Sequence, residues 1–353
     1  MHTHLTRVHL KGFRNIQDTE TTFREGLNII IGPNGCGKSN FLYLLANMDS
    51  EETNKLRITG EFEINSIYGL FKINVLHKLG KNNTVFTDYI YDNTDKDKAN
   101  NSLSEFLSWK LLLSYNIPSL IDCFSSGKTV LLEQSITPER IYYNSTINYS
   151  LLNNLLFCKT FPNYPKIQPS ELNFEQQTIN ILKKYTPIED IRVEFPQRED
   201  EIKEIHQGEI RISNLMYGFK TNNEWFKWNE LSDGTRRIVW LVLNILTTNS
   251  NIILIEEPEL GIHPLQLNKL MEFIKKESKN KQIIITTHSP EVLNVLEPDE
   301  LDRIKLCKYD EVLQTTVMGN ILEDEQVRVA AYMKETGFLS DYWVYVDLEG
   351  TRQ

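Results

Sequence analysis

Eight consecutive residues near the amino terminus have the spacing of a phosphate-binding loop. The segment 32–39 reads Gly-Pro-Asn-Gly-Cys-Gly-Lys-Ser and matches G-x-x-x-x-G-K-[ST] at every fixed position. Glycines let backbone N–H groups close around phosphate oxygens, and the start of a following helix adds positive potential. Lys38 would reach the β- and γ-phosphates, and the Ser39 hydroxyl would take one Mg²⁺ position. The residues predicted to hold a nucleotide here are Asn34, Gly35, Cys36, Gly37, Lys38, Ser39 and Asn40.

Two acidic residues and a histidine follow apolar segments far along the chain. Glu256 and Glu257 come directly after the run 252–255, and His288 comes shortly after the run 283–285. Ligands of an open α/β sheet lie beyond the carboxyl ends of its strands, beside the phosphate loop. Glu256 can therefore hold Mg²⁺, directly or through water, and Glu257 can polarise an attacking water as general base. A lone histidine is more often structural, but the position of His288 at a strand end favours contact with a γ-phosphate.

A third motif precedes an apolar helix. Ser232 and Gly234 lie in the segment Leu-Ser-Asp-Gly-Thr at 231–235, just before the apolar stretch 238–246. Serine is a good N-cap, and the amides of a helix start form an anion site. A capped helix without a ligand is the alternative, so this motif is informative only together with the others.

The elements that must position these residues can be read from hydrophobic runs. Segments 27–31, 251–255 and 282–285 are short, continuous and β-branched, which is typical of buried strands in a sheet covered on both faces. Segment 265–278 between the last two has helical spacing of apolar residues. Strand, helix and strand form a βαβ unit, so the fold class is α/β.

The middle of the chain has different patterns. Residues 56–92 alternate in short bursts between turn residues, which predicts antiparallel hairpins. A helical pattern in short pieces covers 103–184, and 190–228 is extended again. Gly127-Lys128-Thr129 resembles part of the loop motif, but lacks its leading glycine and is interpreted as a turn.

These patterns predict a composite core with insertions. The expected divisions are a discontinuous core of residues 1–50 and 226–353, an antiparallel β subdomain at 51–95, and a mostly helical insertion at 96–225.

Composition narrows the class of protein. The chain has 353 residues, is 40% hydrophobic and carries a net charge of −10, which fits a globular protein but not a constitutive nucleic-acid coat. A local basic groove stays open as an alternative. The four cysteines of the chain form no C-x-x-C pair, and the most apolar stretch of the chain is far too short to span a membrane. We therefore expect a cytoplasmic protein in a reducing compartment.

Together the motifs resemble the ABC-like, AAA-type ATPases of the SMC, RecF and OLD group. That resemblance implies an ABC-type P-loop core, with 32–39 as Walker A, 231–235 as signature, 252–257 as Walker B with a catalytic Glu, 261–264 as D-loop and His288 as switch histidine. It also implies that residues beside Arg14 face the adenine. Gln134 is the candidate for the Q-loop residue.

The spellings Glu-Glu-Pro-Glu at 256–259 and Leu-Ser-Asp-Gly-Thr at 231–235 are most similar to stand-alone ATPases of the OLD branch. Transporter cassettes usually have Asp where Glu256 stands, and the glutamate adds one methylene group between the backbone and the metal. OLD nucleases continue into a Toprim domain. Here a strand-like segment followed by Glu349-Gly350 lies three residues before the end of the sequence, so we expect no nuclease site in this chain.

The resemblance implies a Mg²⁺-dependent ATPase whose ATP is sandwiched in a homodimer. Such ATPases often serve bacterial anti-phage defence, so we expect a sensor or scaffold that works with a separate effector protein, such as a nuclease. The alternative is a DNA-repair clamp of the RecF or SMC kind, with Arg236, Arg237 and the segment 275–281 as seeds of a basic groove. The energising subunit of a transporter is disfavoured, because transporter cassettes usually have Leu-Ser-Gly-Gly-Gln where this chain has Leu-Ser-Asp-Gly-Thr at 231–235.

Overall fold

The computed structural model falls into two units by its internal contacts, and each is described by itself. The first unit comprises Met1–Ser114, Asn249–Leu260 and Met271–Gln353, and the second comprises Tyr115–Thr248 and Gly261–Leu270. The structure describes residues 3–47, 59–66, 69–79, 85–91, 110–112, 130–133, 156–158, 172–174, 176–194, 202–204, 209–212, 216–247, 250–335 and 337–345.

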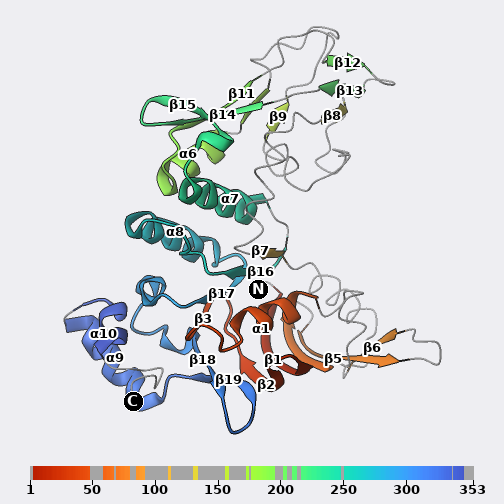
Figure 1. The fold of residues 1–353 in the computed structure, drawn as a ribbon, viewed down its shortest axis with the longest axis vertical. Helices are drawn as coiled ribbons and strands as arrows, with labels where there is room; N and C mark the ends of the chain where they lie inside the picture. Colours follow the sequence, from red (N-terminus) through yellow and green to blue (C-terminus); the bar gives the residue numbers. More distant parts are fainter. Residues whose placement is uncertain are drawn as a thin grey trace. The chain divides into compact units, whose positions relative to one another are not determined.

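A six-stranded sheet forms the centre of the first unit (Figure 1). The strand order in this sheet is β19-β18-β3-β17-β16-β7. The strands β18, β3, β17, β16 and β7 run parallel to one another, and β19 runs antiparallel to β18. The strands are β3 (Leu27–Ile31), β7 (Lys110–Leu112), β16 (Ile252–Glu256), β17 (Gln282–Thr287), β18 (Ile304–Asp310) and β19 (Thr315–Asn320). Every residue of β3, β16 and β17 is buried, as their continuous apolar runs predict.

A second, antiparallel sheet of the first unit has the order β2-β1-β4-β5-β6. Its strands are β1 (His4–Phe13), β2 (Ile16–Thr22), β4 (Thr59–Ser66), β5 (Gly69–Leu79) and β6 (Val85–Tyr91). The hairpins predicted over 56–92 are confirmed by the antiparallel pairing of β4, β5 and β6.

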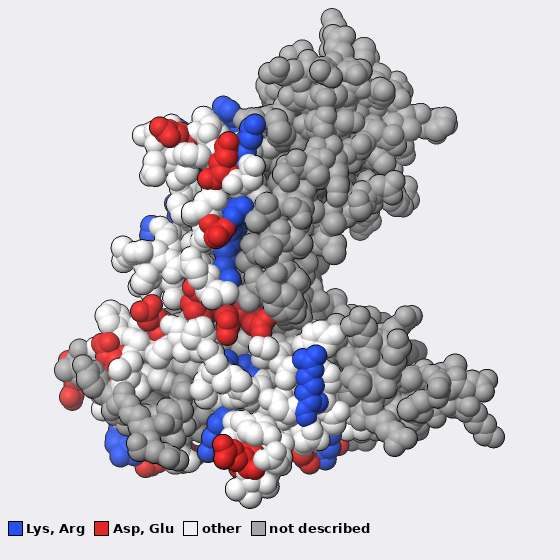
Figure 2. All heavy atoms as spheres, viewed as in Figure 1, with Lys and Arg blue, Asp and Glu red and all other residues white. Residues whose placement is uncertain are grey.

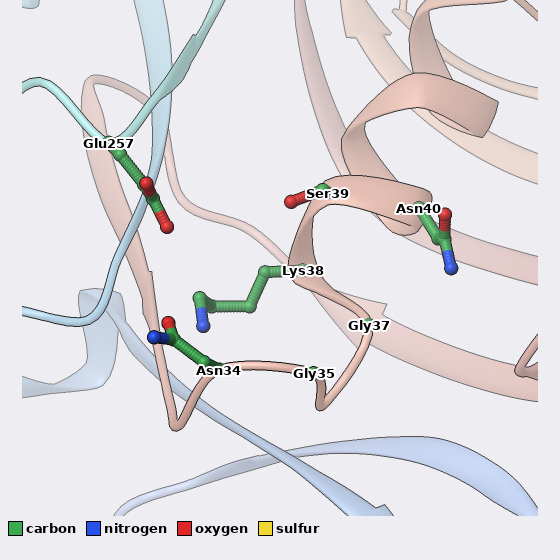
Figure 3. A pocket seen from close by; sticks show the side chains of 7 residues that line it. All are labelled: Asn34, Gly35, Gly37, Lys38, Ser39, Asn40 and Glu257. Atoms are coloured by element: carbon green, nitrogen blue, oxygen red, sulfur yellow. The ribbon is translucent and has the colours of Figure 1, made fainter. Parts of the chain in front are cut away.

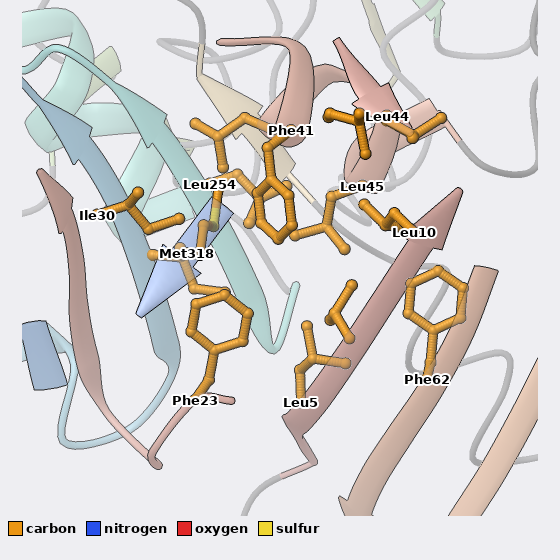
Figure 4. Close-up of a cluster of buried hydrophobic side chains, with 14 of the residues drawn as sticks. Leu5, Leu10, Phe23, Ile30, Phe41, Leu44, Leu45, Phe62, Leu254 and Met318 are labelled. Atoms are coloured by element: carbon orange, nitrogen blue, oxygen red, sulfur yellow. The ribbon is translucent and has the colours of Figure 1, made fainter. Parts of the chain in front are cut away.

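One apolar core joins the two sheets to helix α1 (Lys38–Asn47) (Figure 4). Phe41 and Leu45 project from the helix toward Leu10 of the antiparallel sheet and Ile30 of the parallel sheet. These side chains are at most 2% exposed. Burial of this kind contributes about 1.5–3 kcal/mol for each large apolar side chain, so α1 is fixed against both sheets.

Several shorter elements complete the first unit. Helices α9 (Glu323–Glu335) and α10 (Leu339–Tyr345) follow the parallel sheet, and two 3₁₀ helices, η5 (Pro290–Val295) and η6 (Leu301–Arg303), lie between β17 and β18. Ser340 in α10 pairs with Asn294 in η5 through two hydrogen bonds of 2.9 Å. Helix α8 (Pro264–Glu277) is divided between the two units, with its residues from Met271 onward in the first. It connects β16 to β17, which pair in parallel, and this confirms the predicted βαβ unit.

The second unit contains helices α6 (Gln176–Tyr185) and α7 (Asp233–Thr247) with three small antiparallel sheets. Their strands are β8 (Val130–Glu133), β9 (Leu156–Cys158), β10 (Leu172–Phe174), β11 (Asp190–Glu194), β12 (Ile202–Glu204), β13 (Glu209–Ile212), β14 (Met216–Thr221) and β15 (Glu224–Lys227). The 3₁₀ helix η4 (Trp228–Glu230) leads into α7. Strands β11, β14 and β15 fall where the sequence predicted extended structure.

Other expectations about organisation are only partly covered. Most of the predicted helical stretch 103–184 lies outside the described residues, as do Gly127-Lys128-Thr129, Gln134 and Glu349-Gly350. The described part of that stretch holds α6 and four short strands. The division into three domains stays a prediction. Residues 226–248, which were expected in the core, group with the second unit by their internal contacts. Strands β4 to β6, which were expected as a separate subdomain, share a sheet with β1. Within the described residues, no helix has the length and hydropathy of a membrane span.

Candidate functional site

The loop between β3 and α1 is shaped by its glycines. Gly35 and Gly37 have φ angles of +82° and +110°, a region that side chains with a Cβ rarely enter. A Cβ on Gly37 would lie 2.1 Å from the Thr316 Oγ1, and one on Gly32 would lie 2.0 Å from the Cys307 carbonyl oxygen. The loop is thus packed directly on β18 and β19, which fixes its backbone.

Lys38 is folded over this loop. Its side chain is buried, and its Nζ donates hydrogen bonds to the carbonyl oxygens of Gly32 at 2.6 Å and Pro33 at 2.8 Å. An open pocket of ≈ 160 Å³ lies in front of the ammonium group (Figure 3). The pocket is lined by Asn34, Gly35, Gly37, Lys38, Ser39, Asn40 and Glu257. The structure therefore brings together every predicted loop residue except Cys36, whose side chain is buried elsewhere.

The two predicted carboxylates have different surroundings. Glu256 is the last residue of β16, only 6% exposed, and its Oε2 is buried without a hydrogen-bond partner. A buried carboxylate oxygen without a partner is costly unless water or a cation completes its shell. Glu257 has a φ of +43°, which turns its side chain out of the strand and toward the phosphate loop. Glu256 therefore has the surroundings of a metal ligand, and Glu257 lines the pocket at the phosphate loop.

His288 meets Glu257 because two parallel strands end in register. Glu256 of β16 pairs with Thr286 of β17, and the Glu257 N–H donates to the Thr286 carbonyl at 2.8 Å. The His288 Nδ1 then lies 3.3 Å from the Glu257 Oε1. The sequence placed both residues at strand ends, and the structure confirms that they lie together.

A third carboxylate, Glu259, was not predicted as a site residue. Its Oε1 accepts from the Thr287 hydroxyl at 2.5 Å and the His288 N–H at 3.3 Å, and lies 3.6 Å from the His288 Nδ1. Its Oε2 is buried without a partner. The only sequence signal was the third acidic residue in the run 256–259. Among the described residues no cluster of three or more His, Cys, Asp or Glu side chains has metal-site geometry.

Arg14 lies at the other side of the loop. It follows β1 in the left-handed region, with a φ of +50°, and its NH1 donates to the Asn40 Oδ1 at 2.7 Å. Asn40 in turn donates to the Asn15 Oδ1 at 2.7 Å. Asn15, which no sequence motif indicated as a site residue, accepts from the Thr316 N–H through its backbone carbonyl at 2.7 Å. This chain of contacts fixes Arg14 beside the start of α1.

The signature residues belong to the second unit. The Ser232 side chain is exposed, and its Oγ accepts the backbone N–H of Thr235 at 3.2 Å, which confirms the N-cap of α7. A Cβ on Gly234 would lie 2.6 Å from the Gly261 carbonyl oxygen, so this helix start packs on the predicted D-loop.

Several of the basic residues expected to form a groove are buried or paired with acidic side chains of the protein itself. Arg236 and Arg237 are at most 8% exposed, and Arg236 pairs with Asp233. The Lys275 Nζ lies 2.7 Å from the Glu300 Oε2, and burial lowers the pKa of Lys281. On the face shown in Figure 2, Lys and Arg side chains of the described residues are interspersed with Asp and Glu.

A phosphate loop on a mostly parallel sheet, with carboxylates and a histidine at neighbouring strand ends, defines a P-loop ATPase of the ABC type. Comparison with known proteins agrees. The family described as "AAA domain, putative AbiEii toxin, Type IV TA system" matches residues 27–294, and the chain belongs to this family. The protein is an ATP hydrolase.

Individual relatives support the same assignment. An ATP/GTP phosphatase of Helicobacter pylori is 26% identical over 378 residues, covering 90% of this chain and 96% of the relative. The Septu protein PtuA of Bacillus thuringiensis is 23% identical over 313 residues, covering 84% and 74%. Among solved structures, an Smc head bound to the C-winged helix domain of ScpA has a TM-score of 0.56 at 12% identity, covering 91% of this chain and 99% of that one. This last likeness shows the fold alone.

Proposed function

We propose that two copies of this ATPase bind Mg²⁺-ATP between them and that hydrolysis opens the dimer. The phosphate loop of one copy would face the Ser232–Gly234 helix start of the other, which is the arrangement that the motif resemblance implies. ATP then stabilises the closed dimer, and hydrolysis removes that stabilisation.

The composition of the loop pocket carries this proposal. Lys38 is the only cationic residue among those that line it. A triphosphate with its Mg²⁺ keeps a net negative charge, so further donors stabilise it. The exposed start of α7 at Ser232 offers backbone N–H groups and the positive end of a helix dipole. A second copy would supply them to the γ-phosphate.

Each remaining residue has a role that its surroundings support. Ser39 and Glu256 would hold Mg²⁺, since the unpartnered Glu256 Oε2 fits a ligand of the metal or of its bound water. Mg²⁺ would neutralise phosphate charge. Glu257 would take the proton of the attacking water, and His288, held by Glu257 and Glu259, would contact the γ-phosphate.

We further propose that the chain is a sensor or scaffold in the cytoplasm for a separate effector, in bacterial anti-phage defence. The likeness to a Septu protein and to a family described as a toxin of a toxin–antitoxin system agrees with the defence branch that the motifs resemble. All the chemistry recognised in the described residues serves ATP. Purification from the native host, with mass spectrometry of co-eluting proteins, would identify the effector. A nuclease activity of the purified chain alone that a point mutation abolishes would contradict the scaffold role.

The catalytic assignment is tested with Glu257→Gln. This variant keeps a polar side chain of the same size but cannot accept a proton, so ATP binding should persist while turnover falls about 10²–10⁴-fold. Lys38→Ala should weaken ATP binding itself. Light scattering with ATP should show Glu257→Gln as a stable dimer. Wild-type turnover in this variant would exclude Glu257 as general base.

The composite site is tested with Ser232→Arg. Arginine at this exposed N-cap should leave ATP binding near normal but block ATP-dependent pairing, because it covers the helix start. Asn229→Arg, an exposed position of η4, adds the same charge and is the matched control. Mixing Ser232→Arg with Lys38→Ala should restore at most one working site per heterodimer. Heterodimers that form but show no restored activity would contradict the proposal. DNA binding that weakens steeply with salt would instead favour the clamp alternative.

A further inference from the structure

Two cysteines distant in sequence meet beneath the phosphate loop. The Sγ atoms of Cys36, in the loop, and Cys307, in β18, lie 3.1 Å apart, and both side chains are 2% exposed. Neither is in a disulfide. The ATPase mechanism uses neither thiol, although one of them belongs to the loop that holds the nucleotide.

Cys307 is fixed more tightly by its backbone contacts than Cys36. Cys307 lies in β18, which is paired with β3 on one side and β19 on the other. Cys36 lies in an irregular segment, where its carbonyl oxygen accepts from the Thr316 hydroxyl at 2.8 Å and its N–H makes a long bond of 3.5 Å to the Pro33 carbonyl. A strain between the two sulfur atoms would therefore displace the loop before it displaced the sheet.

Two features of the surroundings of Cys36 favour reaction of its sulfur and act against the effect of its burial in the apolar core. The Lys38 Nζ lies 3.8 Å from the Cys36 Sγ, and helix α1 begins two residues after the cysteine. A nearby ammonium group and a helix N-terminus both stabilise a thiolate, which is the reactive form of cysteine.

From this geometry we propose that Cys36 and Cys307 form a reversible disulfide that switches the ATPase off, with a peroxide as the oxidant. The Cys36 thiolate attacks one oxygen of hydrogen peroxide, the O–O bond breaks, and a sulfenic acid and water result once a proton is taken up. The Cys307 sulfur then attacks the Cys36 sulfur and displaces the hydroxyl group as a second water. Two thiols are oxidised to one disulfide, and one peroxide is reduced to two waters.

The disulfide would alter the loop because its bond is shorter than the present contact. An S–S bond is about 2.05 Å long, so the sulfur atoms must approach by about 1 Å. A loop that follows the Cys36 sulfur must change its contacts with β18 and β19, which Gly32 and Gly37 already approach closely. Displacing catalytic groups by about 1 Å can lower a rate about 10²-fold, so we expect oxidation to reduce ATP turnover at least tenfold.

The test uses the full chain with Cys123→Ser and Cys158→Ser as background. The protein is treated with hydrogen peroxide, digested without reduction and analysed by mass spectrometry for a peptide pair joined through Cys36 and Cys307. ATP turnover and binding of a fluorescent ATP analogue are measured before oxidation, after it, and after dithiothreitol. We expect the cross-linked pair, at least a tenfold loss of turnover, and recovery on reduction.

Cys307→Ala is the decisive variant, with Cys307→Ser as a second should the first not fold. Cys307 does not line the nucleotide pocket, so the basal turnover of both variants should stay within about twofold of that of the background protein. Both should resist peroxide. A variant that loses activity to peroxide as the background protein does would show that Cys36 oxidation alone is responsible, and would overturn the proposal. So would failure of the cross-linked peptide to form.

The cross-link rests on the contact between the cysteines, whereas its effect on turnover rests on the proposed function. A cross-link in a protein without basal ATP turnover would contradict the switch and the catalytic assignments of the loop. Normal turnover without a cross-link would contradict the disulfide alone.

Discussion

Gln282 provides a demanding test of how the nucleotide site is supported. It is the first residue of β17, is 1% exposed, and joins the parallel sheet to the antiparallel one. Its Oε1 accepts the Leu5 N–H at 2.8 Å, and its Nε2 donates to the carbonyl oxygens of Leu5 at 2.8 Å and Arg24 at 3.0 Å. Leu5 pairs with Ile64 of β4, whereas the pairing of β1 with β2 begins only at Arg7, so the glutamine amide takes the place of a strand partner on that side.

The expected effect of Gln282→Met follows from which groups lose their partner. Methionine fills a similar volume, so the main loss is polar. The N–H and carbonyl of Leu5 lose the partners that the side chain supplies, whereas the Arg24 carbonyl keeps its bond from the Asn28 Nδ2 at 2.7 Å. Each of these two buried groups costs about 1–3 kcal/mol when left without a partner, so the free energy of unfolding should fall by about 2–6 kcal/mol.

Gln282→Glu gives the same prediction a pH signature. A carboxylate still accepts from Leu5 but faces two carbonyl oxygens, so burial should raise the pKa of the new side chain above that of the unfolded chain. The folded state then holds more protons, and the stability of this variant should be highest at low pH and fall as pH rises. Gln282→Met lacks this dependence.

Urea unfolding followed by circular dichroism measures these changes, and hydrogen exchange of peptides from β1 reports the first unit directly. Gln326→Met is the matched control, because Gln326 donates a single part-buried bond of 2.7 Å to the Ile321 carbonyl. It should cost about 0.5–1.5 kcal/mol. A cost for Gln282→Met no larger than that of the control, with unchanged exchange in β1, would refute the reasoning.

Three further predictions concern other buried polar groups. Burial lowers the pKa of Lys305 to about 8 from 10.5, so between these pH values the unfolded chain holds more protons than the folded one. As the pH rises through that interval, the free energy of unfolding of the unmodified protein should therefore rise by about 3 kcal/mol relative to that of Lys305→Met. An equal difference in unfolding free energy between the two proteins at pH 7 and at pH 10.5 would contradict this. Glu259→Gln should misorient His288 and lower kcat about tenfold while the Kd for ATP changes less than twofold; a change in Kd alone would argue against positioning. Thr316→Val removes the hydroxyl that donates to the Cys36 carbonyl and should cost about 1–2 kcal/mol in thermal unfolding, with weaker ATP binding as the sign that the loop has moved.

The sequence by itself determined the parallel core and which polar residues lie at its strand ends. Three continuous apolar runs predict β3, β16 and β17, since only strands covered on both faces can be apolar throughout. The spacing of 32–39 predicts the glycine-rich turn, and both φ angles of its inner glycines agree with that geometry. Because parallel strands end at one edge of a sheet, the positions of Glu257 and His288 in the sequence were enough to place them together.

Tertiary structure alone decided which side chains support that edge. Glu259 reaches His288 only through the turn after Glu257, whose positive φ no spacing rule indicates. The pairings of Cys36 with Cys307 and of Gln282 with Leu5 join residues 271 and 277 positions apart. Such contacts depend on the order of strands in the sheets and on the register between them. Local sequence patterns carry the period of a strand or helix, but they do not specify which distant residue will lie against it.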